Sequence, residues 1–370
     1  MGTVNHAMDK LLEKMVQINA SDLHLGVGSP PTFRANGTLM SLEIPPLNSE
    51  MVKEMLYTIL TREQQENFER EKELDFSYSL PGISRFRGNI LLQRGTIGAV
   101  FRAVPSRPLT LDELGLPPVL KKLCDKPRGL VLVTGPTGSG KSTTLAAMID
   151  YINENKPEHI VTIEDPIEFL HKNKKSLIRQ RELGADTNSF AAALKHILRQ
   201  DPDVILVGEM RDLETISLAI TAAETGHLVF ATVHTIGAPA TVDRVVDVFP
   251  PHQQQQIRMQ VSIILEGVIS QTLIPRADGT GRACALEIML GTAGVRNLIR
   301  EGKTHQLTNI IQSGAQHGMQ TLDASLKSLY QQGTISYQEA IAHANNPAEF
   351  RLMTGEESRS GEAQHLSPSV

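Results

Sequence analysis

Eight consecutive residues have the composition and spacing of a phosphate-binding loop. Residues 135–142 read Gly-Pro-Thr-Gly-Ser-Gly-Lys-Ser and match the pattern GxxxxGK[ST] at every fixed position. Glycines let backbone amides turn toward phosphate oxygens, and the N-terminus of a following helix adds partial positive charge. We expect Lys141 to reach the β- and γ-phosphates of a nucleotide and Ser142 to ligate Mg²⁺. The predicted phosphate-binding residues are Gly135, Pro136, Thr137, Gly138, Ser139, Gly140, Lys141, Ser142 and Thr143.

A glutamate follows an apolar run where a catalytic acid is expected. The run Val204–Val207 ends shortly before Glu209. If this run is a strand parallel to the one before the loop, its end lies beside the terminal phosphate. A carboxylate there can hold Mg²⁺ through water or polarise the attacking water, so Glu209 is the candidate general base. The alternative is that Glu209 caps the next helix or pairs with Arg211.

A second apolar run is followed by three acids. Glu164, Asp165 and Glu168 come directly after His159–Ile163. Such a group can bind a metal and orient water, and Glu164 is therefore a candidate catalytic residue. On these residues alone, a solvated turn with helix-capping acids is an equally good interpretation. The predicted metal ligands, direct or through water, are Ser142, Glu164 and Glu209.

Two histidines bracket a third apolar run, Leu228–Val233. His234 lies at the end where phosphates are expected and is a candidate sensor of the γ-phosphate. His227 begins the run and is a candidate nucleotide contact. Strand alternation places residues 227 and 234 on opposite faces, so register alone cannot point both at one site. A lone histidine is ordinarily structural. Beside a phosphate loop, a structural role and a functional role are about equally good interpretations of these two histidines.

These residues need a parallel sheet to bring them together. Uninterrupted β-branched runs separated by helical patterns indicate such a sheet, buried on both faces. The predicted strands are Gly129–Thr134, His159–Ile163, Val204–Val207 and Leu228–Val233, and the predicted helices are Lys141–Asn153, Ser189–Gln200 and Leu213–Glu224. The sequence therefore predicts an α/β domain over residues 119–353. Beyond Gln253 the pattern is largely helical.

The first part of the chain mixes helical and strand patterns, which predicts a small α+β domain over residues 8–104. Four prolines in residues 105–118 remove amide donors and restrict their neighbours, which predicts a connection between domains. Residues 354–370 are rich in Ser, Glu, Gly and Pro, which predicts a disordered tail. The expected elements of the first domain are Met8–Ile18 and Ser49–Glu71 as helices, the latter as one helix or a pair, and Asp22–Leu25, Thr32–Leu39, Leu74–Tyr78, Ser84–Gln93 and Ile97–Ala103 as strands.

Composition excludes several classes of protein. The formal net charge is −5, so no global field favours nucleic acid or an acidic membrane surface. Cys124 and Cys284 lie far apart without a CxxC pair, which argues against a disulfide framework or a structural zinc site and suits a reducing cytosol. No apolar run approaches the roughly 18 residues that a membrane span needs. We expect a cytoplasmic protein with no nucleic-acid partner and no membrane insertion.

Four segments together resemble the boxes of the secretion ATPase superfamily of P-loop NTPases. GPTGSGKST resembles the Walker A box, TIEDPIEF the Asp box, RQDPDVILVGEMRD the atypical Walker B box with glutamate as its acid, and TGHLVFATVHT the His box. Within the superfamily, the chain resembles the type IV pilus retraction ATPases of the PilT family. The N-terminal domain is short, a four-cysteine zinc module is absent, and residues 294–299 (GVRNLI) are similar to that family's AIRNLI motif, departing at Gly294 and Val295.

The resemblance implies a fold, a reaction and partners. The fold is a RecA-like P-loop NTPase core with a smaller, PAS-like N-terminal α+β domain. The reaction is ATP hydrolysis with Mg²⁺. The assembly is a homohexameric ring at the cytoplasmic face of the inner membrane, which engages a pilus platform protein and powers pilus retraction and twitching motility.

The resemblance also implies that each active site lies between the two domains and takes arginines from the N-terminal one. SRFRGN and AVFRAVP resemble the family's arginine-bearing strands, which nominates Arg87 and Arg102 as catalytic. A planar guanidinium can neutralise charge that develops on a transferred phosphoryl group. Without the resemblance, a solvated and mildly basic sheet face is the favoured interpretation. The arginines of this region are Arg85, Arg87, Arg94, Arg102 and Arg107.

Three alternatives remain open at this point. The first is a related motor: a pilus-assembly, accessory retraction or type II secretion ATPase. The second is a nucleotide-binding ring subunit without turnover, which the presence of Lys141, Ser142 and Glu209 disfavours. The third is a nucleic-acid translocase, which a net charge of −5 and the absence of tryptophan disfavour.

Overall fold

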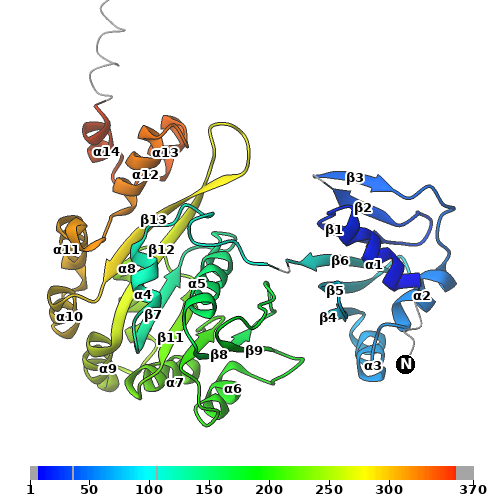
Figure 1. Cartoon of the computed structure of the whole chain (residues 1–370), viewed down its shortest axis with the longest axis horizontal. Coiled ribbons are helices and arrows are strands. Elements are labelled where there is room, and N and C mark those ends of the chain that lie inside the picture. Colours follow the sequence, from blue (N-terminus) through cyan, green and yellow to red (C-terminus); the bar gives the residue numbers. More distant parts are fainter. Residues whose placement is uncertain (1–6, 36, 106, 356–370) are drawn as a thin grey trace, which may run out of the picture. The chain divides into compact units, whose positions relative to one another are not determined.

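The computed structural model describes residues 7–35, 37–105 and 107–355 (Figure 1). They form two compact units. The first contains the residues up to Pro108 together with Ile167–His171, and the second contains Leu109–Pro166 and the residues from Lys172 onward. The predicted tail lies outside the described residues from position 356 onward.

The first unit is built on a six-stranded antiparallel sheet in the order β3-β2-β1-β6-β5-β4. Helices α1, α2 and α3 pack against the sheet, as Figure 1 shows. The α+β architecture expected for this part of the chain is therefore present. Its elements are α1 (Ala7–Gln17), β1 (Asp22–Leu25), β2 (Thr32–Ala35), β3 (Thr38–Ser41), α2 (Ser49–Tyr57), α3 (Arg62–Glu71), β4 (Glu73–Leu80), β5 (Ser84–Gln93) and β6 (Thr96–Val104).

Strand alternation gives this sheet one apolar and one polar face. Leu23, Phe33, Phe86 and Phe101 are each at most 1 % exposed and form the core under the helices. Their neighbours along the strands carry the charged side chains, as a half-buried sheet requires. One detail differs from the sequence prediction, because the expected strand Thr32–Leu39 is a hairpin of β2 and β3. Residues 49–71 form a helix pair, which is one of the two forms predicted for them.

The second unit is an α/β domain whose sheet has the order β13-β12-β7-β11-β10-β8-β9. All neighbouring pairs are parallel except β12 with β13. Helices α4 and α5 cover one face of the sheet, and α6 to α11 pack on the other. Figure 1 shows α10 to α14 gathered beside β13. The predicted parallel sheet is confirmed, and it aligns the ends of β7, β8, β10 and β11 at one edge.

Each strand and helix predicted for the second unit is present with ends within three residues of the prediction, but α4, β9 and α8 were not predicted. The elements of this unit are α4 (Val119–Cys124), β7 (Gly129–Thr134), α5 (Lys141–Asn155), β8 (His159–Glu164), β9 (Leu177–Glu182), α6 (Phe190–Ile197), β10 (Val204–Val207), α7 (Leu213–Glu224), β11 (Leu228–Val233), α8 (Ala238–Asp247), α9 (Pro251–Ile264), β12 (Leu265–Pro275), β13 (Arg282–Leu290), α10 (Ala293–Arg300), α11 (Leu307–Ser313), α12 (Leu322–Gln331), α13 (Tyr337–His343) and α14 (Pro347–Thr354), with short 3₁₀ turns at Thr304–Gln306 and Ala315–His317.

The prediction of a largely helical region beyond Gln253 is wrong, because β12 and β13 lie there. Helix α9 ends at Ile264 and β12 begins at Leu265, so helix and strand join directly with no loop between them, and Gly267 lies inside the strand and not at the boundary. The sequence of β13 is rich in Ala, Leu, Glu and Met, which are helix formers. Tertiary burial overrides that preference, since most of β13 is enclosed by the sheet and α12.

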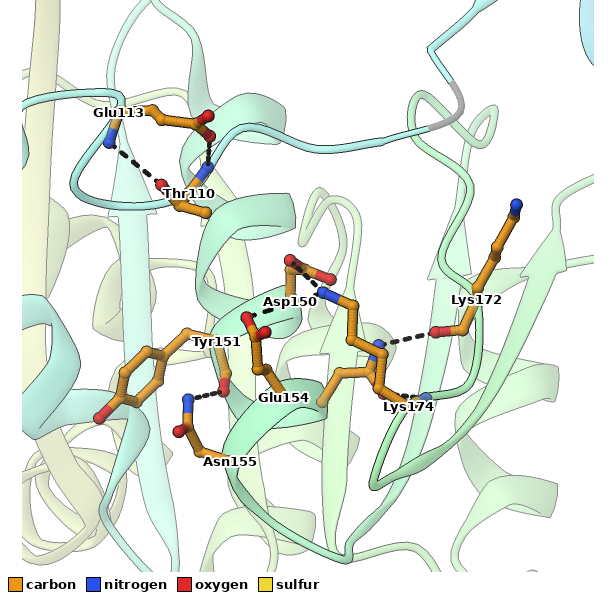
Figure 2. Close-up of polar contacts among 9 residues, drawn as sticks. Thr110, Glu113, Asp150, Tyr151, Glu154, Asn155, Lys172 and Lys174 are labelled. Carbon is orange, nitrogen blue, oxygen red and sulfur yellow. Dashed lines mark hydrogen bonds and ion pairs between the residues drawn. The ribbon is translucent and has the colours of Figure 1, made fainter.

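The chain enters the second unit at Leu109, and a reciprocal pair of hydrogen bonds fixes the entry (Figure 2). The amide of Thr110 donates to Oε2 of Glu113 at 2.8 Å, and the amide of Glu113 donates to Oγ1 of Thr110 at 3.1 Å. This arrangement has the form of a capping box, which satisfies two backbone donors at once. The end of the proline-rich segment is therefore tied to the α/β domain.

The chain re-enters this unit at Lys172, where it is fixed to helix α5 (Figure 2). Nδ2 of Asn153 donates to the carbonyl of Lys172 at 2.8 Å, and the amide of Lys174 donates to Oδ1 of Asn153 at 2.9 Å. Nζ of Lys174 also pairs with Oδ2 of Asp150 at 2.9 Å. Helix α5 thus holds the predicted phosphate loop at its first residue and the returning segment near its last turn.

None of the helices in the described part of the chain is both long enough and apolar enough to cross a membrane.

Candidate active site

The predicted phosphate loop connects β7 to α5, in the strand–loop–helix context that its motif requires. Gly135, Gly138 and Gly140 have φ values of 136°, 77° and 86°, which side-chain-bearing residues rarely adopt. A Cβ added at Gly135 would lie 2.7 Å from Oγ of Ser139 and closer still to the carbonyl oxygen of Gln271. The glycines are therefore required by the backbone conformation and by close approach of neighbouring atoms.

Lys141 is held inside this loop as a buried cation. Its residue is 8 % exposed, and Nζ donates to the carbonyls of Gly135 at 2.9 Å and Pro136 at 3.0 Å. The ammonium group thus lies within the curve of the loop, at the N-terminus of α5, where anions are favoured. Ser142 and Thr143 follow on the first turn of α5 and are half-buried. This donor set fits a nucleotide phosphate.

A residue that the sequence analysis did not identify supports the loop from β12. Gln271 is 1 % exposed, and its Nε2 donates to the carbonyl of Ser139 at 2.6 Å. Arg282, at the start of β13, reaches the carbonyl of Gly138 at 3.4 Å. Both contacts come from strands that were expected to be helical, and no sequence motif marked either residue.

The structure brings Glu209 and His234 together at the edge of the sheet that carries the phosphate loop. Glu209 follows β10 and His234 follows β11, which lies between β10 and β7. Oε1 of Glu209 is 3.1 Å from Nε2 of His234 and 2.5 Å from Nε of Arg211. The ion pair with Arg211, one alternative predicted for Glu209, is thus present. Glu209 does not cap the next helix, because Asp212 caps α7 by accepting a hydrogen bond from the amide of Thr215 at 2.9 Å.

The surroundings of Glu209 keep its carboxyl group ionised. Burial alone would raise its pKa, but the hydrogen bonds and positive charges of Arg211 and His234 together exceed that effect and leave the pKa below its ordinary value. The same pairing raises the pKa of Arg211, chiefly through its hydrogen bond to Glu209. A carboxylate in this state can accept a proton but cannot donate one at neutral pH.

Glu164 ends β8, next to β10 in the sheet, and so lies at the same edge as Glu209. Its Oε1 accepts from Oγ1 of Thr162 at 2.7 Å and from Nε2 of Gln180 at 3.1 Å. Within the described residues, no group of three or more His, Cys, Asp or Glu side chains is arranged to hold a metal ion. The assignment of Ser142, Glu164 and Glu209 as Mg²⁺ ligands remains a prediction.

His227 lies at the opposite end of β11 from His234. Its Nδ1 is 2.9 Å from the carbonyl of Ala222, and its own carbonyl accepts from the amide of Gly129 at 3.0 Å. The strand between the two histidines spans about 20 Å at the usual rise per residue. His227 therefore lies at the other end of β11 from the phosphate loop of its own subunit, and its assignment as a nucleotide contact remains a prediction.

Arg87 and Arg102 are directly opposite each other on the polar face of the first unit, in β5 and β6. Nε of Arg102 pairs with Oδ1 of Asp22 at 2.8 Å, with the side chains 67 % and 7 % exposed. Burial raises the pKa of Asp22, but its bonds to Ser21 and Arg102 more than offset this and lower it. Arg87 is exposed and forms no ion pair with another described residue. Its side chain is therefore available to an anion.

The loop after His234 is held by residues that sequence reasoning also missed. Oε1 of Glu287, in β13, accepts from the amide of Ala238 at 2.7 Å, and Oγ of Ser270, in β12, accepts from the amide of Gly237 at 2.9 Å. Glu287 is 6 % exposed, and burial raises its pKa. These contacts fix the N-terminus of α8 and, with it, the segment that carries His234.

A family model and individual relatives among known proteins place this chain in the same family. The family model described as "Type II/IV secretion system protein" matches residues 1–343. The chain is 54 % identical over 341 residues to the type IV pilus retraction ATPase PilT of Pseudomonas aeruginosa, covering 92 % of this chain and 99 % of that protein. It is 43 % identical over 359 residues to the type IV pilus ATPase PilU of the same organism, covering 97 % and 94 %.

A solved structure agrees with both. The chain superposes on the crystal structure of the pilus retraction motor PilT with bound ADP at a TM-score of 0.86 and 46 % identity, covering 93 % of this chain and 98 % of that one. The expected fold class, a RecA-like ATPase domain with a smaller N-terminal domain, is thereby confirmed. The phosphate loop, the acid after β10 and the histidine after β11 occupy one edge of that fold, and the chain belongs to the type II/IV secretion system protein family, among the ATPases of its PilT branch.

Proposed function

We propose that this chain is the ATP-hydrolysing subunit of a hexameric motor that retracts type IV pili. The observation that carries the proposal is that a phosphate loop and an ionised glutamate in contact with a histidine follow neighbouring parallel strands at one edge of the sheet. The name of the P. aeruginosa relative at 54 % identity supplies the direction of movement.

The residues of the loop would bind and orient the nucleotide. Lys141 and the backbone amides at the start of α5 face the β- and γ-phosphates, and the Ser142 hydroxyl is placed to ligate Mg²⁺. Bound Mg²⁺–ATP supplies the phosphoryl group and a divalent charge that offsets its anionic oxygens. Because Lys141 is buried and already oriented by two carbonyls, little rearrangement is needed for it to meet a phosphate.

Glu209 would act as the general base. Its lowered pKa keeps it ionised at neutral pH, and its contacts with Arg211 and His234 are made at Oε1. We assign to Oε2 the task of accepting a hydrogen bond from the attacking water. His234 fixes the carboxylate in position and, at the end of β11 next to β7, is placed to respond to the terminal phosphate. Glu164 is proposed to hold Mg²⁺ through water from the adjacent strand.

Turnover is proposed to require assembly. Arg87 and Arg102 are the candidate cations for the charge that develops during phosphoryl transfer, as arginine fingers are in other P-loop enzymes. We propose a homohexamer that works at the cytoplasmic face of the inner membrane on a pilus platform protein. The accessory retraction ATPases remain the nearest rival, because the P. aeruginosa PilU is 43 % identical to this chain. The higher identity to PilT, 54 %, favours the main retraction motor.

The experiment is deletion of the gene, with complementation by the wild type and by Lys141→Ala. A retraction motor predicts abundant pili without twitching in the deletion strain and in the Lys141→Ala strain, with both phenotypes reversed by the wild-type gene. Loss of pili in the deletion strain would instead indicate an assembly motor, and normal twitching would indicate an accessory one.

A further inference from the structure

We infer that Gln271 is a positioning residue for the phosphate loop, and that its side-chain amide sets the loop conformation that binds the nucleotide. This inference rests on the proposed nucleotide-binding function of the loop and adds a residue from outside every motif. The starting observation is a hydrogen bond of 2.6 Å between Nε2 of Gln271 and the carbonyl of Ser139, both buried.

The position of Gln271 in β12 explains how one residue can reach the whole loop. Strand β12 pairs in parallel with β7, and the last paired residues are Ser270 and Thr134. Beyond Thr134 the backbone of β7 leaves the sheet to form the loop, so Gln271 is the first residue of β12 that faces the loop instead of a strand. Its backbone lines the start of the loop and its side chain lines the end.

Both of these approaches are close. The carbonyl oxygen of Gln271 occupies the space where Gly135 would carry a Cβ. Its Nε2 would lie 3.2 Å from a Cβ at Gly140, the residue that precedes the first helical residue Lys141. Gln271 therefore contacts the two glycines between which the loop closes, and its bond to Ser139 fixes the direction of that carbonyl. Because a trans peptide holds its C=O and N–H in opposite directions, a Ser139 carbonyl that points at β12 turns the following amide away from β12.

Two polar atoms at this contact lack partners among the described residues. They are Oε1 of Gln271 and Oγ of Ser139. A buried polar atom without a hydrogen bond costs roughly 1–3 kcal/mol, and such atoms tend to be kept for function. An apolar side chain of similar size would avoid the cost at Gln271. We take the retained amide as a sign that the donor to Ser139 is needed to hold the loop.

The test is the affinity of purified full-length protein for a fluorescent ADP analogue, measured with the midpoint of thermal unfolding without nucleotide. Gln271→Met keeps the side-chain length and removes the donor. The matched control is Gln320→Met, because Nε2 of Gln320 also donates to a backbone carbonyl, that of Leu286, at 3.0 Å, but makes no contact with the loop. We expect ADP affinity to fall about tenfold in Gln271→Met and less than twofold in Gln320→Met, with similar unfolding midpoints.

A second variant guards against misfolding of the first. Gln271→Glu keeps the shape but places a carboxylate against the Ser139 carbonyl and near the phosphates, so it should weaken ADP more than Gln271→Met does. Normal ADP affinity in both variants, or a loss that Gln320→Met matches, would overturn the inference and leave the proposed function intact. Failure of the wild type to bind ADP would instead overturn the proposed function.

Discussion

Oε1 of Glu209 lies 3.1 Å from Nε2 of His234, and the two residues follow neighbouring parallel strands. The contact joins the acid of one predicted box to the histidine of another, at the edge of the sheet where β7 passes into the phosphate loop. Burial raises the pKa of Glu209, but its hydrogen bonds and neighbouring charges outweigh burial and lower the pKa, so the carboxyl group is ionised and can accept a proton at neutral pH. The side chain of His234 is 42 % exposed.

Lys141→Ala is expected to abolish hydrolysis. The change removes the buried ammonium group from the curve of the loop and with it the hydrogen bonds from Nζ to the carbonyls of Gly135 and Pro136. Loss of one preorganised charge-stabilising donor costs about 10²–10³ in rate. The measurement is steady-state phosphate release at saturating Mg²⁺ and ATP, with Lys195→Ala, an exposed lysine on α6, as control. Near-normal release by Lys141→Ala would refute the assignment of the loop.

Arg211→Gln is expected to shift the acid limb of the turnover–pH profile toward higher pH. Arg211 is 72 % exposed, so the pair itself adds little stability, but its hydrogen bond and charge lower the pKa of Glu209. Without Arg211 the carboxyl group protonates at a higher pH, and the base is lost earlier on acidification. The profile of kcat from acidic to neutral pH checks this. An unshifted acid limb would mean that Glu209 is not the group whose ionisation controls turnover.

Substitutions in α10 are expected to separate stability from motor function. Arg296 donates to the carbonyl of Gly291 at 2.7 Å and pairs with Glu266 at 2.7 Å, and Ile299 is 0 % exposed. Ile299→Ala should therefore lower the free energy of unfolding by about 2–5 kcal/mol. Asn297 is exposed, so Asn297→Ala should change the free energy of unfolding by no more than about 0.5 kcal/mol.

Asn297→Ala is consequently the informative variant of the GVRNLI segment. We expect it to bind ADP and hydrolyse ATP normally while twitching fails, since the segment carries no phosphate-binding signature. Denaturant unfolding and a twitching assay on the same variant check both parts. Full twitching with normal stability would remove Asn297 from the motor mechanism.

Hydrolysis per subunit is expected to rise with protein concentration as the ring assembles. Arg87 is exposed without an ion pair in the described structure, so Arg87→Ala should assemble and bind ATP yet hydrolyse it about 10³-fold more slowly. Arg62, 92 % exposed on α3, provides the control variant. Light scattering and phosphate release over one dilution series give both quantities. Full specific activity in a dilute monomer would contradict the shared site.

Arg102→Ala alone cannot test a role of Arg102 in hydrolysis, because it also leaves Asp22, whose side chain is 7 % exposed, without its ion-pair partner. Removing one member of such a pair leaves a buried charge uncompensated. The double variant Arg102→Ala with Asp22→Asn removes both charges. If Arg102 acts on phosphate, the double variant folds like the wild type and still hydrolyses slowly; if Arg102 is only structural, its activity is normal.

The sequence predicted the parallel sheet well, because uninterrupted apolar runs leave few alternatives. Strands β7, β10 and β11 agree residue for residue with the predicted Gly129–Thr134, Val204–Val207 and Leu228–Val233. Strand β12 was missed because it follows α9 directly, with no loop between the two elements. The apolar pattern did not mark the change from helix to strand, and β12 is held as a strand by pairing with β7 and β13.

The site was predictable only where a motif marks it. The loop and Glu209 follow from spacing and strand context. The contact of Gln271 with Ser139 joins residues 132 positions apart, and no local pattern distinguishes this glutamine from others in the chain. His227 was singled out from its motif neighbourhood, and its role as a nucleotide contact remains a prediction.

The most direct test of the account is phosphate release by Glu209→Gln, beside its affinity for an ATP analogue. The amide keeps the shape of the side chain and cannot accept the proton of the attacking water. We predict that nucleotide affinity stays within about twofold of the wild type while turnover falls about 10²–10⁴-fold, and that Glu214→Gln, at an exposed position in the first turn of α7, changes neither. Turnover by Glu209→Gln near the wild-type rate would contradict the assignment of Glu209 as the base on which the proposed motor depends.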